Sequence, residues 1–454
     1  SRSSVDSTSE EELVESTKPT FYPYSFQERP SQFDVDDFVK GSLMDKIQED
    51  SFKGFYNFTM IYMIASVVML IVMPRAPLTP IYNFAQRGWL ITFDVLTCVR
   101  SWEGVFVAML LCGAILLHSL QYYALWKLHV KLHLSYPVTF SIYAVLQVVF
   151  AVMYSVLIWR SIIPLAPRRP LTRRPLTAVL PMMLMVVMAL KGHSFIFTNY
   201  GMEKQSTESI PNSFGHYCYF LCPSRARVIC RVCPTLLYEL DYPRTKTIRF
   251  AYVARTGLYM CVAFSLMYAI MMQFVYPILS DTSSNLIYRI LRCSLSAFII
   301  WLLLFFSVFH CLLNILAEVT MFGDRLLYED WWNATTLAEF WKKWNGPIHY
   351  WCLRHVYVET QVYAKASKPL ASWVPARLLT YSLATFFVSG VAHELVCSVV
   401  FRKPSLYFFL GMVVQVPLQL ICKHFENSRI GNMIVWVSLF LGQPLLEVRG
   451  WVVG

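Results

Sequence analysis

The chain has 454 residues, of which 56% are hydrophobic and 15% are charged, and its mean hydropathy is +0.47. A soluble domain carries about 25% charged residues, so the composition excludes an ordinary soluble protein. It predicts instead an all-α protein that crosses the bilayer many times. The net charge is +11. The basic residues lie between apolar segments without a nucleic-acid-binding motif, so we expect a membrane surface or a polyanionic ligand as their partner, and no nucleic acid.

The N-terminal region differs from the rest of the chain. Residues 1–50 are polar and acidic, contain the run Ser-Thr-Ser-Glu-Glu-Glu and show little apolar periodicity. We therefore expect a disordered cytosolic tail without a cleavable signal peptide, followed by a membrane-embedded domain over 51–454. Twelve scattered Cys, many of them inside apolar runs, favour buried free thiols over a disulfide framework.

About nine transmembrane helices are predicted from the apolar segments, which puts the two termini on opposite sides of the membrane. The expected spans are 55–73, 104–124, 136–159, 177–198, 251–275, 287–316, 378–400, 405–422 and 431–446. The loops 200–249 and 319–376 carry seven and six Lys and Arg residues. By the positive-inside rule these loops lie in the cytosol with the N-terminal tail. The arginine-rich stretch 168–174 falls on the opposite side and disagrees with this orientation.

One apolar run, from Leu378 to Val400, contains the pair His393-Glu394. Ionisable groups at the centre of a membrane helix are costly and are candidates for function. On a helix Ser389, His393 and Cys397 share one face, with Phe386 expected mainly off it. We therefore expect His393 to face a protein interior that leaves room for a substrate. The alternative is a histidine that only hydrogen-bonds a neighbouring helix.

The loop 319–376 is the second informative region. It contains five tryptophans between 331 and 351 beside Lys and Arg, a composition typical of cytosolic helices that lie in the membrane interface. We expect interfacial anchoring to explain most of these tryptophans. It does not explain Asn345 and His349, which are four residues apart in apolar company.

Several sequence blocks resemble the membrane-bound O-acyltransferases, in the branch of sterol O-acyltransferases and type 1 diacylglycerol acyltransferases. The matching blocks are Pro234–Tyr238, Tyr242–Thr245, Tyr328–Asn333 (Tyr-Glu-Asp-Trp-Trp-Asn), Trp344-Asn345 with His349, Val391–Glu394 and Gly442–Pro444. The resemblance covers about 100–446 with the blocks in the family's order. It implies nine spans, the endoplasmic reticulum membrane and a homodimer or homotetramer.

The resemblance also implies roles for individual residues. His393 is similar to the family's catalytic histidine, and Asn345 to its second essential polar residue. The remaining positions match substrate-binding residues: Ser389, Gln415 and Gln443 in the acyl and acceptor tunnel, His349 and Tyr357 near the acyl-CoA entrance, and Tyr328, Trp332 and Asn333 in the signature block, where a structural or coenzyme-facing role is expected. No metal and no cofactor is implied, because acyl-CoA is a co-substrate.

The expected chemistry also follows from the residue types. An acyl thioester is already activated, so the reaction needs a base for the acceptor hydroxyl and a donor for the developing oxyanion. A histidine titrates near neutrality and serves as the base, and an Asn amide supplies the donor. Glu394 either orients His393 or pairs with another helix. The second arrangement fits helix geometry better, because adjacent helical residues face different directions.

Other classes of function fit the sequence less well. No Gly-x-Ser-x-Gly motif and no Walker loop occurs, and a transporter is disfavoured because the chain shows no internal repeat. The pair His129 and His133 is interpreted as part of an interfacial helix rather than a metal site. Cys218, Cys222, Cys230 and Cys233 have the spacing of a zinc knuckle. The family lacks residues 222–232, so we interpret this stretch as an insertion, and residues 447–454 also depart from the family's aromatic tail.

The acceptor is predicted to be a membrane sterol, giving a steryl ester for storage. This prediction depends on His193-Ser194-Phe195, which resembles the His-Ser-Phe or His-Ser-Tyr tripeptide of sterol enzymes. The alternative acceptor is diacylglycerol, giving triacylglycerol. The stretches 345–357 and 442–445 resemble diacylglycerol enzymes more closely and keep that alternative open.

Overall fold

In the computed structural model, the described residues are 53–72, 102–161, 174–205, 234–239, 242, 245–280, 285–358, 377–401 and 403–453. Within these ranges the chain is helical and has no strands, which confirms the all-α prediction. Six helical runs are long and apolar enough to cross a membrane: Val105–Leu132, Tyr136–Arg160, Ala178–Gly201, Phe250–Ile278, Ile287–Val319 and Ser382–Phe401. Two shorter apolar helices, Tyr407–Lys423 and Arg429–Gly442, follow.

Each of the nine expected spans coincides with helix in the described residues. The elements are α3 (Lys53–Val72), α6 (Trp102–His118), α7 (Leu120–Leu132), α8 (Tyr136–Ser161), α9 (Arg174–Gln205), α11 (Phe250–Ile270), η4 (Met271–Val275), α12 (Tyr276–Ser280), α13 (Leu286–Phe305), η5 (Phe306–Leu312), α14 (Leu313–Val319), η6 (Trp331–Asn333), α15 (Leu337–Trp344), α16 (Gly346–Cys352), η7 (Leu353–Val358), α19 (Arg377–Phe401), α20 (Tyr407–Val413), α21 (Gln415–Lys423) and α22 (Arg429–Val453). The number that cross the membrane stays a prediction.

Several of these helical runs are interrupted where hydropathy alone predicts one continuous span. The break between α6 and α7 lies at Ser119, whose hydroxyl bonds the Leu116 carbonyl. Two spans contain π-helical turns, η4 and η5. The break between α20 and α21 lies at Val414. Such local breaks are frequent near functional sites in membrane proteins.

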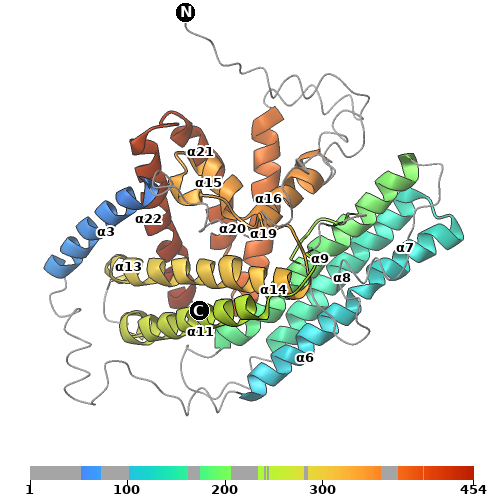
Figure 1. Ribbon diagram of the computed structural model, residues 1–454, viewed down its shortest axis with the longest axis horizontal. Coiled ribbons are helices and arrows are strands. Elements are labelled where there is room, and N and C mark those ends of the chain that lie inside the picture. The colour runs from blue at the N-terminus through green and yellow to red at the C-terminus, as the bar shows by residue number, and fades with distance from the viewer. Residues whose placement is uncertain are drawn as a thin grey trace, which may run out of the picture.

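The helices fall into two groups on either side of α19 (Figure 1). One group contains α6, α7, α8 and α9, whose buried core is built mainly from aromatic and Met side chains. The other contains α3, α13 and α22 around an aromatic cluster. The short elements α15, α16 and α20 lie beside α19 (Figure 1). Helix α19, which carries His393, is therefore central to the arrangement.

The burial of three tryptophans, two in the aromatic cluster and one in a smaller core beside α16, corrects the interpretation of these residues. Trp331 and Trp332 are 2% and 6% exposed, and Trp351 is 5% exposed. Trp344 stacks on Trp301 with ring centroids 4.4 Å apart. Interfacial anchoring is therefore wrong for the three buried tryptophans, because their rings fill protein cores. Their amphipathic rings suit an interface and a core equally well, and the sequence alone does not separate the two.

A buried ion cluster fixes the chain where it enters and leaves the α11–α14 pair. The carboxylate of Glu318, which is fully buried, lies 2.9 Å from the guanidinium nitrogens of both Arg249 and Arg325. It also accepts a hydrogen bond from the backbone N–H of Arg249. A buried carboxylate requires such compensation. The cluster therefore holds the segment that leads into the signature block.

Candidate active site

His393 lies in the second half of α19. Its Nδ1 atom is 2.8 Å from the backbone oxygen of Ser389 and 3.4 Å from the Ser389 hydroxyl. A carbonyl oxygen only accepts hydrogen bonds, so Nδ1 carries the hydrogen. In the neutral ring Nε2 is then the proton acceptor. The helix thus presents a histidine in the tautomer that a general base requires.

The surroundings of His393 differ from the expectation in two ways. The side chain is exposed rather than enclosed in a packed interior, and Ser389 beside it is half-buried. Phe386, which we expected mainly off this face, lies seven residues before His393 and so almost two full turns away, on the same side. Phe386 is buried, whereas the His393 ring is exposed.

Asn345 joins two short helices. It is the C-cap of α15 and the N-cap of α16, where its Oδ1 accepts a hydrogen bond from the Ile348 N–H at 3.2 Å. Because Oδ1 is used in the cap, the Nδ2 donors point away from the helix end. The next residue, Gly346, passes so close to Leu326 that an added Cβ would lie 2.9 Å from its carbonyl oxygen. This packing fixes the position of the Asn345 amide.

Trp341 connects the elements that carry these polar groups. Its indole N–H donates to Oε1 of Gln415 on α21 at 3.3 Å, and its ring packs edge-on against Phe386 of α19. Gln415 in turn donates to the Gly411 carbonyl. The structure therefore brings α15, α19 and α21 together, and with them the elements that carry Asn345, His393 and Gln415. Trp341 was not singled out from the sequence, where it is one tryptophan among five.

His349 is half-buried on α16, one turn after Asn345. Burial, and secondarily the charge of Lys342, lowers its pKa to about 4. His349 is therefore neutral at physiological pH. Its imidazole therefore offers a polar but uncharged group on α16. The side chains of Tyr357, at the end of η7, and of Gln443, in α22, lie outside the described residues.

The signature block packs mainly against other parts of the protein. The Tyr328 hydroxyl is 2.9 Å from Nδ1 of His310, an intramembrane histidine in η5 that the sequence reasoning missed. Asn333 accepts a hydrogen bond from the Gly54 N–H at the start of α3, and the Trp332 carbonyl accepts one from Asn432 of α22. These contacts favour the structural alternative for the block.

Glu394 adopts the second of the two arrangements considered for it. Its carboxylate accepts hydrogen bonds from the backbone N–H groups of Ser405 and Leu406 at 2.8 Å, and from that of Phe409 at 3.3 Å. These groups lie at the start of α20. The carboxylate therefore caps a neighbouring helix instead of contacting the adjacent histidine.

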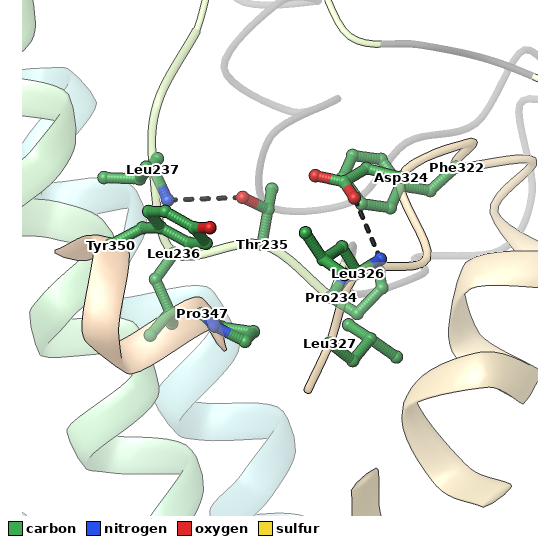
Figure 2. Close-up of a pocket in the computed structure, with 10 residues that line it drawn as sticks. All are labelled: Pro234, Thr235, Leu236, Leu237, Phe322, Asp324, Leu326, Leu327, Pro347 and Tyr350. Atoms are coloured by element: carbon green, nitrogen blue, oxygen red, sulfur yellow. Dashed lines mark hydrogen bonds between the residues drawn. The ribbon is translucent and has the colours of Figure 1, made fainter. Parts of the chain in front are cut away.

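Two of the cavities that described residues line differ in size. Figure 2 shows the first, which lies between the 234–237 segment, the 322–327 segment and Pro347 and Tyr350 of α16; its volume is about 30 Å³. This is room for about one water molecule, so it is too small for a substrate. The second, of about 570 Å³, is an open cavity along α22, lined almost entirely by apolar groups of that helix and by Leu418 of α21, and it reaches Gly442. Its size and lining suit a hydrocarbon chain.

The remaining sequence interpretations concern metals and termini. His129 is buried, and its two ring nitrogens lie 2.7 Å from the Thr139 hydroxyl and 2.9 Å from Glu203, so it takes part in a protein hydrogen-bond network. It lies in α7, the second part of the apolar run Val105–Leu132 that is interrupted at Ser119. The four-cysteine motif over 218–233, the tail 1–50 and the side chains of 447–454 lie outside the described residues.

Comparisons with known proteins agree with a multi-pass helical membrane protein. Residues 107–447 match the MBOAT, membrane-bound O-acyltransferase family. The chain belongs to this family and is an acyltransferase. It is 30% identical to diacylglycerol O-acyltransferase 1C of Glycine max over 421 residues, covering 88% of this chain and 75% of that protein.

Two further relatives have related names. Diacylglycerol O-acyltransferase 1 of Arabidopsis thaliana is 30% identical over 412 residues, covering 88% of this chain and 73% of that protein. Diacylglycerol O-acyltransferase 1 of Bos taurus is 34% identical over 220 residues, covering 47% of this chain and 43% of that protein. These relatives do not support the sterol prediction that we based on His193-Ser194-Phe195, and they favour the diacylglycerol alternative.

Proposed function

We propose that the chain transfers a long-chain fatty acyl group from acyl-CoA to the free hydroxyl of diacylglycerol, giving triacylglycerol. The observation that carries the proposal is the similarity to diacylglycerol O-acyltransferases over 88% of the chain. The apolar cavity beside α22 supports a hydrocarbon-rich substrate. The same proposal places the enzyme in the endoplasmic reticulum membrane, as a homodimer or homotetramer.

In the proposed mechanism His393 acts as general base. Nε2 removes the proton of the acceptor hydroxyl as its oxygen attacks the thioester carbonyl carbon. The bond from Nδ1–H to the Ser389 carbonyl keeps the ring in the required tautomer and stabilises the imidazolium that forms. No covalent acyl-enzyme is needed, because the thioester is already activated.

Asn345 is proposed to stabilise the tetrahedral intermediate. Its Nδ2–H donates to the carbonyl oxygen as negative charge develops there. The C–S bond then breaks, coenzyme A leaves as a thiolate, and the sulfur takes the proton from the His393 imidazolium. The products are the ester and coenzyme A with a free thiol, and His393 is neutral again. Ser389 and Gln415 are proposed to line the path of the substrates.

The test uses membranes from cells that lack their own neutral-lipid synthases. Labelled oleoyl-CoA is supplied with diacylglycerol and a sterol, and label is measured in triacylglycerol and in steryl ester for the intact chain and for His393→Ala. The proposal predicts labelled triacylglycerol that is lost in the variant. Labelled steryl ester without labelled triacylglycerol would show that the acceptor is a sterol and not diacylglycerol. Undiminished ester formation by His393→Ala would exclude the histidine-base mechanism.

A further inference from the structure

Ser194 and His355 form a buried pair that joins two distant parts of the chain. The Ser194 hydroxyl lies 2.9 Å from Nε2 of His355, and the two residues are 161 positions apart in the sequence. Ser194 is 0% exposed and His355 is 5% exposed. The same hydroxyl accepts a hydrogen bond from the Tyr238 N–H at 2.9 Å. One serine of α9 thus binds both η7 and the 234–239 segment.

A second bond repeats this connection one turn earlier on both helices. The indole N–H of Trp351 donates to the Leu190 carbonyl at 3.0 Å. Trp351 precedes His355 by four residues, and Leu190 precedes Ser194 by four. The two hydrogen bonds therefore join α9 to the α16–η7 unit (residues 346–358) at two successive turns.

Packing holds the α16–η7 unit from its other sides. Arg354 forms an ion pair with Glu239 at 2.6 Å, and both side chains are largely buried. Leu236 and Leu237 pack with Trp351 and neighbouring residues of the unit, and Ala384 of α19 packs against the same cluster. The unit is thus clamped between α9, the 234–239 segment and the helix that carries His393.

The residue directly before the α16–η7 unit is Asn345, which is proposed to stabilise the oxyanion. Asn345 caps its first turn, and His349 follows one turn later. The side chains of Ser194 and His355 are buried, so they act on the reaction through the backbone they hold. Loss of these two hydrogen bonds would let the Asn345 amide move relative to α19, and catalytic geometry tolerates little displacement.

We propose that Ser194 and His355 are positioning residues that set the α16–η7 unit for acyl-CoA, and that they do not select the acceptor. This inference rests on the proposed acyltransferase function. It assigns the serine of the His-Ser-Phe tripeptide, from which a sterol acceptor was predicted, to the acyl donor side of the reaction instead.

The test measures kcat and KM for each substrate separately in Ser194→Ala, His355→Ala and His355→Gln. For Ser194→Ala we expect kcat/KM for oleoyl-CoA to fall on the order of tenfold. The KM for diacylglycerol and the ratio of triacylglycerol to steryl ester should stay within about twofold. His355→Gln keeps an N–H donor and should retain more activity than His355→Ala.

A double-mutant cycle and a matched control make the test specific. Because the two side chains share one bond, Ser194→Ala combined with His355→Ala should lose about as much as either single change. Ser307→Ala is the control, because Ser307 is equally buried and its hydroxyl bonds only the Leu303 carbonyl of its own helix. Its kcat/KM for oleoyl-CoA should stay within about twofold of the intact chain.

Three results would overturn the inference: a changed acceptor KM, a changed product ratio, or additive losses in the cycle. If Ser194→Ala does not fold, the two His355 variants carry the comparison. Binding of a non-transferable thioether of oleoyl-CoA is measured in parallel and should weaken by a similar factor. An intact chain that binds this thioether but makes no ester would remove the proposed function, while the thioether affinities would still decide the positioning role.

Discussion

The backbone oxygen of Ser389 determines which ring nitrogen of His393 accepts a proton, since it accepts the hydrogen of Nδ1. His424 offers a natural comparison, because its Nδ1 lies 3.2 Å from the Leu420 carbonyl, four residues earlier on α21. Both rings are exposed. The two histidines thus share local geometry and differ in their place in the fold.

A glutamine in place of His393 keeps a donor for the Ser389 carbonyl but removes the base. We expect His393→Gln to lower turnover by about 10²–10⁴-fold, the usual contribution of a general base, while acyl-CoA affinity changes little. His424→Gln should leave turnover unchanged. Both are measured by single-turnover transfer of labelled oleoyl-CoA. Similar turnover in the two variants would contradict the assignment of the base.

His349 leads to a prediction about pH. Its pKa is lowered to about 4, mainly by burial, from an ordinary value of 6.5. Between pH 6.5 and 4 the unfolded chain binds a proton that the folded chain does not, so stability falls as the pH falls through this window. At pH 5 the loss is on the order of 2 kcal/mol. The melting temperature of the intact protein should therefore drop more between pH 7.5 and 5 than that of His349→Gln.

The lowered pKa of His349 also leads to a prediction about activity. His349 is neutral above pH 5, so a change in kcat/KM between pH 6 and 7.5 does not come from its titration. We expect such a change to persist in His349→Gln. Its disappearance in that variant would show that His349 titrates in the working range and would contradict the effect of burial.

At the scale of elements, the Glu394 carboxylate holds the start of α20. It accepts three backbone N–H bonds there, from Ser405, Leu406 and Phe409. Gly390 lies one turn earlier on α19, where an added Cβ would be 2.9 Å from the Phe409 ring. The two helices therefore approach closely at the level of the His393-Glu394 pair.

Removal of the cap should loosen α20. We expect Glu394→Ala to destabilise the protein on the order of 2 kcal/mol, because it leaves backbone donors without an acceptor. Glu394→Gln keeps one acceptor oxygen and should lose less. Hydrogen exchange of residues 405–409 should be faster in Glu394→Ala than in the intact chain. Unchanged exchange there would mean that the carboxylate does not hold the helix.

Hydropathy predicts the apolar segments because each spans about 20 residues, and hydropathy summed over a window of that length detects them. The breaks at Ser119 and Val414 and the π-turn at His310 escaped it, because they depend on a shift of backbone hydrogen bonds within an apolar run. The candidate base His393 was found because a charge in such a run is rare. The bond between Ser194 and His355 joins residues 161 positions apart, and no local pattern indicates it.

At the scale of the whole molecule, one side chain connects three segments that are far apart in the sequence. Asn432 of α22 donates to the carbonyls of Trp332 and Ala334 in the signature block, at 3.0 and 2.8 Å. Its Oδ1 accepts from the Asn57 side chain of α3 at 2.9 Å. Asn432 is 4% exposed, so these bonds are shielded from water. The contacts also explain why Trp332 is buried.

Asn432→Ala should therefore destabilise the whole assembly of α3, the signature block and α22. The change leaves two carbonyls and one amide of the protein interior without their partner, and each such group costs about 1–3 kcal/mol. Because a carbonyl oxygen can accept a second hydrogen bond, the two carbonyls are not left fully unsatisfied. We therefore expect the free energy of unfolding to fall by about 2–4 kcal/mol in total, measured as a lower melting temperature in detergent. Asn285→Ala is the control, since Asn285 is an exposed N-cap whose side chain accepts a hydrogen bond from the Ile287 N–H, and its loss should cost about 1 kcal/mol. Equal losses in the two variants would mean that the three segments do not depend on Asn432, and that the aromatic cluster around Trp331 and Trp436 alone holds them together.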